Sequence, residues 1–493
     1  MKRYSLIFFG ILMAFSANSQ NETDALRYSY LNYNGTARYA GLGGAMGALG
    51  ADMSAISMNP AGMGRYSRSD FSFTGDFTFT NSKGSYDDNT LNGNKANFNM
   101  TNIGAVFVKP FSFEDATLWK YFQFGITSSR TNDFHSKTFI EGKNNKSLIT
   151  SYTNNLNDNN TPLGDLSDFY EGLAFDASLL YFDSLSGVYT PWYNENDAEI
   201  LQTKKTVTRG AQYQTDIVFS GNYNGKLYVG GSIGFPRIRY NTSSTYNEEF
   251  LKVDSILDTE GFTMKEDIST EGSGFNMKLG LIYAPFKFLR VGLAAHTPTW
   301  YTLTDQYTTQ FTSDFTDNTY DAIEPSPDGT YDYRLKTPGR VMGSVALLYK
   351  KRGFLTFEYE YVDYANSKFK NAFDDVSSDP DNFNDENKVS NTIYQGASII
   401  KAGAEVRVTN LWTVRGGYTY YGSPIKDAYA KVDASRTNIS AGIGFKNRDF
   451  SIDITYLRSK WKEESYLYDP SLVSLTETTK TLNNFMVTAG FRF

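Results

Sequence analysis

The side chains best suited to catalysis are scarce in this chain. Its 493 residues include two histidines, His135 and His296, and no cysteine. A serine–histidine–carboxylate triad would need one of these rings beside a serine and a carboxylate, and no spacing in the sequence indicates such a set. Without cysteine there is no thiolate nucleophile, thiolate metal ligand or disulfide. The sequence therefore predicts that the protein is not an enzyme, and it indicates no metal site and no cofactor.

A glycine-rich stretch at residues 41–52 could be mistaken for a nucleotide-binding loop. Its glycines do not give the Gly-x-Gly-x-x-Gly spacing, and no strand precedes them. Small residues also let a backbone pack closely against another backbone or a ligand, and we expect that role here. The net charge of −7 argues against a nucleic-acid partner, because phosphate binding needs a basic face.

Charged residues recur at alternate positions of several apolar segments. Glu358 and Glu360, for example, alternate with Phe357, Tyr359 and Tyr361. An Arg facing lipid near mid-membrane would cost about 2–4 kcal/mol, so in a membrane barrel such charges should face the lumen. There they would pair with one another or hold a ligand head group; for His296, a ligand hydrogen bond and a structural network are both open. The polar lumen candidates are Arg290, His296, Arg340, Glu358, Glu360, Glu405, Arg407 and Arg415.

Long strands of period two would position these charges. In the final segment Val487, Ala489, Phe491 and Phe493 share one face, and the chain ends on an aromatic residue, which is typical of the closing strand of a bacterial outer-membrane barrel. A soluble sandwich would not normally need so many long strands. The sequence predicts an all-β fold, a 14-stranded antiparallel transmembrane β-barrel. Its strands are expected near residues 68–82, 95–109, 119–135, 207–223, 226–240, 265–284, 287–308, 330–350, 353–370, 390–409, 411–424, 434–446, 449–463 and 480–493.

Short and long connections alternate between these segments. Asn224-Gly225 is a strong hairpin signal because both residues tolerate positive φ. The alternation is typical of short periplasmic turns and long extracellular loops. In the longest predicted loop, residues 136–206, apolar residues between Leu163 and Phe182 suggest one or two short amphipathic helices. They would form either a hydrophobic landing surface over the barrel mouth or a lid packed against its loop neighbours.

The N-terminal region is predicted to be an export signal followed by a plug. Lys2 and Arg3 precede a short apolar run and the small residues of Ala17-Asn18-Ser19, so residues 1–19 are expected to be a signal peptide; an anchor helix is the alternative. A barrel of 14 strands is too wide for its own side chains to fill. We therefore expect residues 20–67 to form an N-terminal hatch inside a barrel of residues 68–493. The hatch candidates for close packing or ligand contact are Gly41, Gly43, Gly44, Asn59, Pro60, Ala61 and Gly62.

Several of these residues resemble the FadL/TodX type of long-chain fatty-acid transporters in the outer membrane. The glycine-rich stretch at residues 41–52 and Asn59-Pro60-Ala61-Gly62-Met63 carry the resemblance in the N-terminal region. Further segments that carry it are Arg290-Val291-Gly292-Leu293 with Thr297-Pro298, Thr337-Pro338-Gly339, Glu358-Tyr359 with Asp363-Tyr364, Arg415-Gly416-Gly417-Tyr418 with Ser423-Pro424, and the terminal Ala489-Gly490-Phe491-Arg492-Phe493. One departure is that His296 stands where the family has arginine and Thr297 where it has serine, which weakens the expectation of a bound fatty-acid carboxylate.

The resemblance implies passive uptake of hydrophobic compounds, such as long-chain fatty acids, by hatch movement and lateral exit through the barrel wall. The expected partners are a hydrophobic small molecule or lipid, bound near residues 35–63, and the lipid of the outer membrane. The alternative from another class is a barrel that does not transport and acts as a scaffold in an outer-membrane secretion or assembly complex. A surface receptor is a third hypothesis, motivated by the loops.

Overall fold

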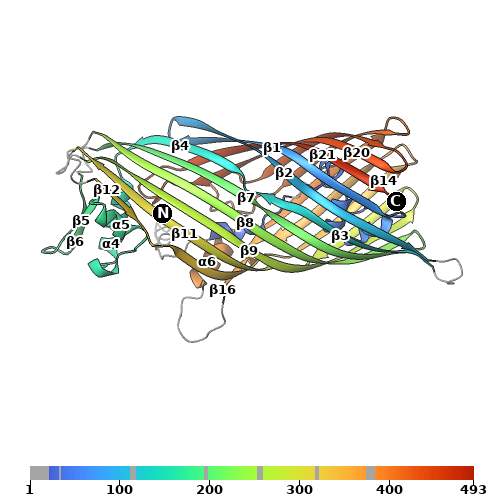
Figure 1. Cartoon of the computed structure of the whole chain (residues 1–493), viewed down its shortest axis with the longest axis horizontal. Helices are drawn as coiled ribbons and strands as arrows, with labels where there is room; N and C mark the ends of the chain where they lie inside the picture. Colours follow the sequence, from blue (N-terminus) through green and yellow to red (C-terminus); the bar gives the residue numbers. More distant parts are fainter. Residues whose placement is uncertain are drawn as a thin grey trace, which may run out of the picture.

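The computed structural model describes residues 22–32, 35–111, 118–193, 198–252, 259–316, 321–372 and 383–493. The predicted signal peptide, residues 1–19, lies outside these ranges. The chain forms a closed antiparallel barrel of 14 strands, as the alternation predicted (Figure 1). Strands β1 and β21 close it in continuous register, from Asp70 opposite Arg492 to Tyr86 opposite Thr476. No helix in the described ranges is long and apolar enough to cross a membrane.

Four barrel strands are interrupted part-way, so each of these four carries two labels. In chain order the wall consists of β1 (Asp70–Tyr86), β2 (Asn89–Pro110), β3 (Trp119–Asp133) continued by β4 (Ser136–Asn144), β7 (Glu199–Tyr223), β8 (Leu227–Lys252), β9 (Thr259–Phe286), β10 (Leu289–His296) continued by β11 (Trp300–Phe315), β13 (Gly329–Lys336) continued by β14 (Arg340–Tyr349), β15 (Gly353–Asp363) continued by β16 (Lys368–Asn371), β17 (Gly396–Arg407), β18 (Trp412–Tyr421), β19 (Arg436–Lys446), β20 (Phe450–Ser465) and β21 (Thr476–Arg492).

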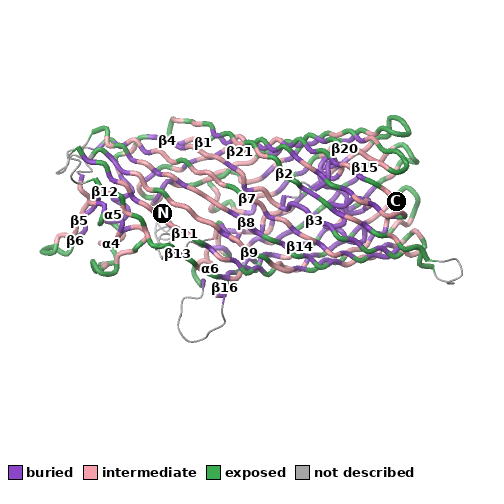
Figure 2. The backbone as a smooth tube through the Cα atoms, in the orientation of Figure 1, coloured by how far each residue is buried: buried purple, intermediate pink, exposed green. Residues whose placement is uncertain are grey.

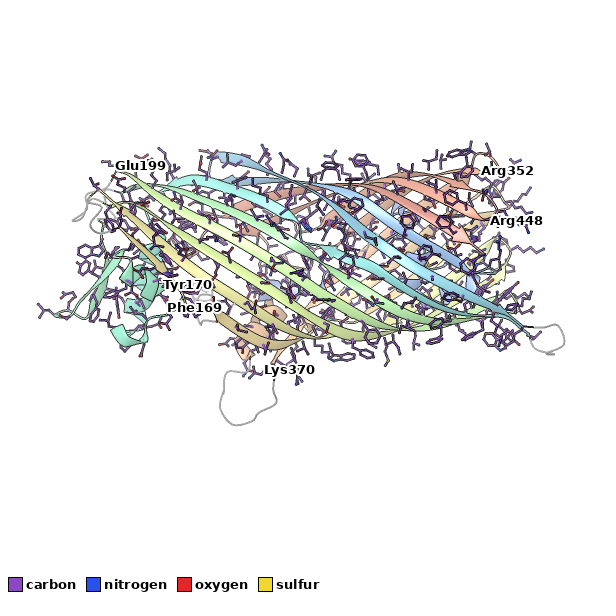
Figure 3. The ribbon with its side chains drawn as sticks, viewed as in Figure 1. Phe169, Tyr170, Glu199, Arg352, Lys370 and Arg448 are labelled. Atoms are coloured by element: carbon purple, nitrogen blue, oxygen red, sulfur yellow. The ribbon has the colours of Figure 1, made fainter. Side chains whose placement is uncertain are left out.

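An apolar belt surrounds the end of the barrel that carries the short turns. On β21, Phe485 and Val487 are 50% and 48% exposed, whereas Met486 between them is fully buried. Arg352 and Arg448 lie at this short-turn end, and Glu199 and Tyr170 lie at the opposite end (Figure 3). Alternate side chains therefore face lipid and lumen, which explains the period of two in the sequence.

The N-terminal region lies inside the barrel. Residues 36–66, called the inner hatch from here on, pack against strands on all sides, and the most buried part of the molecule is this half of the barrel (Figure 2). The Asp52 carboxylate accepts hydrogen bonds from the backbone N–H groups of Ser54 and Ala55 and from the Thr36 hydroxyl. The helices of this region are α1 (Glu22–Ser29), α2 (Ala37–Gly41), α3 (Met53–Met58) and the 3-10 helix η1 (Pro60–Arg65).

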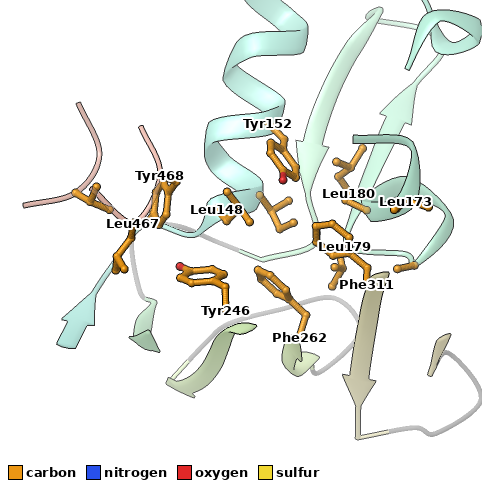
Figure 4. Close-up of a cluster of buried hydrophobic side chains, with 14 of the residues drawn as sticks. Leu148, Tyr152, Leu173, Leu179, Leu180, Tyr246, Phe262, Phe311, Leu467 and Tyr468 are labelled. Atoms are coloured by element: carbon orange, nitrogen blue, oxygen red, sulfur yellow. The ribbon is translucent and has the colours of Figure 1, made fainter. Parts of the chain in front are cut away.

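The connection between β4 and β7 forms a compact cap at the end opposite the short turns. Residues 145–193, called the cap, contain α4 (Leu148–Asp158), η3 (Leu163–Asp165), α5 (Glu171–Asp176) and the hairpin of β5 (Leu180–Asp183) and β6 (Val188–Pro191). Cap residues such as Tyr152 pack against the lumen-facing rings of Tyr246, Phe262 and Phe311 (Figure 4). This packing is that of a lid inserted into the mouth, while Leu185 at the hairpin tip is 97% exposed.

Several predicted loops are shorter than expected because the strands continue beyond the apolar belt. The predicted loop 136–206 includes β4 and the start of β7, and the predicted loop 83–94 is reduced to a turn at Asp87 and Asp88. Outside the belt both faces of a strand are polar, so the alternation that identifies a membrane strand disappears although the hydrogen-bond ladder persists. The Asn224-Gly225 turn has φ of 52° and 67°, as a tight hairpin requires. The remaining elements are β12 (Ala322–Pro325), η5 (Tyr364–Asn366) and α6 (Asn384–Ile393).

Candidate functional site

A chamber of about 580 Å³ lies in the lumen between the inner hatch and the cap. Three levels follow one another along the inner face of β7: Gln202 contacts the cap, Lys204 and Thr208 line the chamber, and Ser220 meets Gly64 of the inner hatch. The lining combines polar and apolar side chains. It includes Thr23, Leu26, Arg27, Tyr30, Asn32, Thr80, Asn132, Asp133, Phe134, His135, Ser136, Thr138, Ile140, Lys204, Thr206, Thr208, Tyr240, Tyr394, Arg436, Trp461, Glu463, Tyr466, Lys480 and Leu482.

The floor of the chamber is α1 with the segment that follows it, and this floor is bonded to β3. The Asn132 amide donates to the backbone oxygens of Arg27 and Tyr30 over 3.3 and 3.0 Å. The Asn32 backbone N–H donates to the Thr131 oxygen over 2.7 Å. Tyr30 also stacks on the ring of Tyr364 across the lumen. The floor is therefore attached to β3 directly before the point where that strand is interrupted.

The interruption lies at Phe134 and His135, between β3 and β4. His135, the last residue of the predicted strand 119–135, lies within the wall, where its Nδ1 is 2.7 Å from Asp133 Oδ1. Asp133 also pairs with the buried Arg130, which pairs in turn with Asp76 of β1 over 2.9 Å. A buried ion-pair chain thus fixes the end of β3, because an unpaired charge here would be costly.

Beyond the interruption, side chains take the place of a backbone ladder between β4 and the β1–β2 hairpin. The pairing of β2 with β3 ends at Asn102 opposite Ser129, and within the described residues β4 pairs with β7 but not with β2. β4 lies under the β1–β2 hairpin, since a Cβ on Gly93 would be under 3.0 Å from the Lys137 oxygen. We call this contact between β4 and the β1–β2 hairpin the seam.

In the described residues the hydrogen bonds across the seam come from side chains. The Ser82 and Ser136 hydroxyl oxygens are 3.3 Å apart, and the Asn89 amide donates to Glu141 over 3.0 Å. Lys95 Nζ reaches past β4 and donates to the Thr208 oxygen of β7 over 3.1 Å. Both side-chain amide atoms of Asn97 are buried without a hydrogen-bond partner among the described residues. A contact of this kind can separate at lower cost than a ladder in which every residue is backbone-paired.

One cation of the chamber has unused hydrogen-bonding capacity. Arg436 stacks over the Trp461 ring, with its guanidinium carbon 4.3 Å from the ring centroid, and its Nε donates to Asn438. Its Nη2 is buried and makes no hydrogen bond within the described part of the chain. A guanidinium with an open N–H beside aromatic rings can bind an anionic group at the end of an apolar molecule.

The inner hatch is fitted to the wall through pairs of glycines. Gly230 and Gly280 lie opposite each other on β8 and β9 and receive Pro60 and Asn59, whose amide also donates to the Gly47 oxygen over 2.8 Å. A second pair, Gly403 and Gly417 on β17 and β18, receives Leu42 and Gly43 in the same way. A side chain at any of these wall positions would collide with hatch backbone or with Asn59.

Buried ion pairs hold the wall around the inner hatch. Lys401 Nζ lies 2.8 Å from Glu358 and 2.9 Å from Glu360, and Arg340 lies 2.7 Å from Glu360. The free oxygen of Glu358 accepts a 2.8 Å hydrogen bond from the Gly47 backbone. The charges thus bind one another and the hatch.

The remaining predicted polar residues contact the inner hatch or lie at the short-turn end. His296 Nε2 is 2.7 Å from the Met58 oxygen, and Arg290 lies 3.4 Å from the Leu49 oxygen. Glu405 pairs with Arg38 and Arg415, while Arg407 is exposed at the short-turn end.

None of the predicted hatch or polar residues lines the chamber. Gly41, Gly43, Gly44, Asn59, Pro60, Ala61 and Gly62 face the wall or their own turn, and the polar set faces the inner hatch or a second cavity of about 430 Å³ near the short turns. The chamber residues that sequence reasoning missed belong to α1, the β3 interruption and β19. The available signal was the polar run before Phe134, which breaks the alternation of its strand.

Comparison with known proteins gives matches in structure alone. No protein-family model matches the chain, and no curated protein matches it. The fold superposes on a Pseudomonas aeruginosa FadL homologue (TM-score 0.57, 14% identity, covering 94% of this chain and 100% of that chain). It also superposes on the toluene transporter TodX of P. putida (TM-score 0.54, 13% identity, covering 94% of this chain and 99% of that chain). A third match is the toluene transporter TbuX of Ralstonia pickettii (TM-score 0.51, 16% identity, covering 94% of this chain and 99% of that chain). The chain therefore has the fold of the FadL/TodX-type barrels.

Proposed function

We propose that the protein is an outer-membrane channel for the passive uptake of hydrophobic or amphipathic compounds, and that it belongs to the FadL/TodX family. The main support is that the chamber reaches the interruption between β3 and β4, beyond which no backbone ladder joins the described residues of β4 and β2. In this proposal residues 1–19 are the signal peptide, residues 20–67 the hatch and residues 68–493 the barrel. Ligand leaves the chamber through the seam, between β4 and the β1–β2 hairpin, and enters the bilayer beside Phe98 and Met100 of β2, which are 64% and 51% exposed.

Sideways exit suits an apolar ligand. Its transfer into water costs about 0.8 kcal/mol per CH₂ group, so an axial path through a hydrated lumen and the periplasm would be unfavourable. The seam begins at the outer edge of the apolar belt, where the pairing of β2 with β3 ends close to the exposed Met100. Its separation leaves the backbone pairs of β1 with β2 and of β4 with β7 intact. The ligand thus passes from one apolar environment to another.

The floor of the chamber provides the trigger in this mechanism. Ligand entering the chamber displaces α1 and Tyr30, which releases the hydrogen bonds that Asn132 makes to their backbone. The end of β3 is then free to move. The inner hatch, wedged into glycine pairs and bonded to buried ions, keeps the axial path closed. The open N–H of Arg436 favours a ligand with an anionic end, such as a long-chain carboxylate.

A disulfide across the seam tests the proposal. The chain has no cysteine, so Ser82→Cys with Ser136→Cys introduces the only pair, at hydroxyls now 3.3 Å apart. We expect oxidised cells to lose uptake of radiolabelled oleate and to regain it after reduction, when assayed in a host without its own fatty-acid channel. The matched control, Ser85→Cys with Thr90→Cys, joins the two strands of the same hairpin, where the hydroxyls are 3.0 Å apart, without crossing the seam.

Uptake unchanged by the Ser82–Ser136 crosslink would reject the seam as the exit. Absence of oleate and toluene uptake in every variant, together with stoichiometric proteins co-purifying from native membranes, would favour the scaffold hypothesis instead.

A further inference from the structure

The outer surface of the barrel changes character beyond the apolar belt. On β8 the outward residues run from Ile233 and Phe235 to Arg237 and Arg239, all exposed. Arg209 is exposed on the neighbouring strand β7. Arg239 pairs with Glu271, but Arg209 and Arg237 form no ion pair within the described residues. In a chain whose net charge is −7, this is a local concentration of guanidinium groups.

A polar groove of about 780 Å³ lies on the same face, beyond the arginines. It crosses β7, β8, β9 and β11, which lie side by side in Figure 1. Its lining is rich in hydroxyl, amide and charged groups and contains two aliphatic side chains, Val207 and Ile268. The lining residues are Lys205, Val207, Arg209, Asn241, Thr242, Ser243, Thr245, Asp267, Ile268, Ser269, Gln306, Tyr307, Thr308, Asp328, Gly329 and Thr330.

We infer that this face binds the phosphorylated sugar head group of a glycolipid in the outer leaflet, with the arginines on its phosphates and the groove on its sugars. The inference rests on the outer-membrane location in the proposed function, but not on transport. If the acyl chains of a glycolipid lie against Phe235, its phosphates come next along the strand in the direction away from the short turns, and its sugars lie farther in the same direction. The strand presents an apolar belt, guanidinium groups and a hydroxyl-rich groove in this same order.

The chemistry of the groove favours a glycan over a protein partner. Arginine binds phosphate through paired N–H donors, and its fork geometry suits a phosphate monoester better than an ammonium would. Stable protein interfaces bury aromatic and aliphatic anchors at their centre. The lining of this groove instead includes Asn241, whose side-chain oxygen accepts a 2.8 Å hydrogen bond from Ser269, and Asp267. Such groups exchange hydrogen bonds with sugar hydroxyls.

Binding of purified deep-rough lipopolysaccharide, which consists of lipid A and inner-core sugars, tests the inference. The full-length protein in detergent is titrated and the retained glycolipid is measured by native mass spectrometry. For Arg209→Gln with Arg237→Gln and Arg239→Gln we expect the apparent affinity to fall by about tenfold or more. The matched control removes three exposed cations of the β14–β15 turn, Lys350→Gln with Lys351→Gln and Arg352→Gln, and should bind as the native chain does.

Two further measurements separate the contributions of phosphate and sugar to glycolipid binding. Dephosphorylated glycolipid should bind the native chain as weakly as intact glycolipid binds the triple arginine variant. Asn241→Trp fills the groove while keeping the arginines, so it should weaken glycolipid binding but not the binding of phosphatidylglycerol. Variants are compared only after heat-modifiable gel mobility shows a folded barrel.

The inference is overturned if the native chain binds phosphatidylglycerol as tightly as the glycolipid, or if the triple arginine variant binds the glycolipid normally. Because the readout is binding, a chain that fails in oleate uptake could still pass this test, and the converse also holds.

Discussion

Single wall glycines determine whether the inner hatch can dock. A Cβ on Gly280 would lie under 3.0 Å from Asn59 Oδ1 and from Pro60 Cδ, and both neighbours are themselves tightly packed. We predict that Gly280→Ala displaces η1, makes residues 36–66 sensitive to protease and produces ion leakage in planar bilayers. Gly343→Ala is the matched control, because the nearest atom to its Cβ is 3.8 Å away on the lipid face. If residues 36–66 resist protease equally in both variants, close packing of the hatch does not depend on the glycine at position 280.

The ion pairs around Lys401 are a second residue-level determinant of stability. Lys401→Met leaves Glu358 without a cation partner and Glu360 with Arg340 alone, in a buried position. We expect the free energy of unfolding to fall by about 3–5 kcal/mol, the usual cost of breaking a buried ion pair on one side. Urea titration followed by heat-modifiable mobility measures the change.

A surface lysine provides the comparison for Lys401. Lys351→Met lies in an exposed turn and should change stability by less than about 0.5 kcal/mol. A similar effect of both substitutions would mean that water reaches the Lys401 network.

At the scale of elements, one buried carboxyl group lies at the junction between the cap and the barrel. Glu248, near the cap end of β8 and far beyond the apolar belt, accepts hydrogen bonds from the Leu148 backbone N–H, Gln202 and the Tyr246 hydroxyl. Gln202 and the Tyr468 hydroxyl also donate to the Lys146 oxygen. Burial raises the pKa of Glu248 to about 7, although these hydrogen bonds oppose the shift.

The docked cap should therefore weaken as pH rises. A raised pKa means that the docked state favours the protonated carboxyl, so docking is strongest below the ordinary glutamate pKa of 4.5 and declines as pH passes about 7. Hydrogen exchange of residues 145–193, corrected for intrinsic rate, should increase between pH 5 and pH 8. Glu248→Gln should remove this dependence, whereas Glu199→Gln, at an exposed carboxyl, should retain it. A native cap whose exchange does not change with pH would contradict the assignment.

The elements also show what the sequence could predict. All 14 strands were predicted because lipid on one face and lumen on the other impose alternation wherever a strand crosses the membrane. Strand ends beyond the belt lack that signal, so β7 and β8 extend well past their predicted limits. The interruption at Phe134 and the seam were missed because they depend on which strands pair, and a single strand's pattern does not encode its partner. The partners of the polar candidates come from residues distant in sequence, which the pattern of one strand does not encode.

At the scale of the whole molecule, two axial barriers enclose a chamber with one weak side. The inner hatch closes the short-turn end with residues such as Leu42, Ile56 and Met63, which are fully buried. The cap closes the other end through an aromatic cluster. Beside the chamber the seam lacks a backbone ladder in the described residues, so lateral movement there disturbs few paired groups. In the proposed mechanism ligand uptake and a barrier to ions can coexist, because lateral exit would not require the hatch to leave the lumen.

Removal of each barrier in turn tests this division of roles. Replacement of residues 148–193 by a short Gly-Ser linker should leave planar bilayers without ion current, because the inner hatch alone seals the lumen. Deletion of residues 36–66 should give a conducting pore, since a barrel of 14 strands is too wide to be filled by its own side chains. Heat-modifiable mobility identifies variants that still form the barrel. Ion current through the cap-deleted chain would show that the hatch does not seal the lumen by itself. Absence of current through a folded barrel without the hatch would show that the cap is the main barrier to ions.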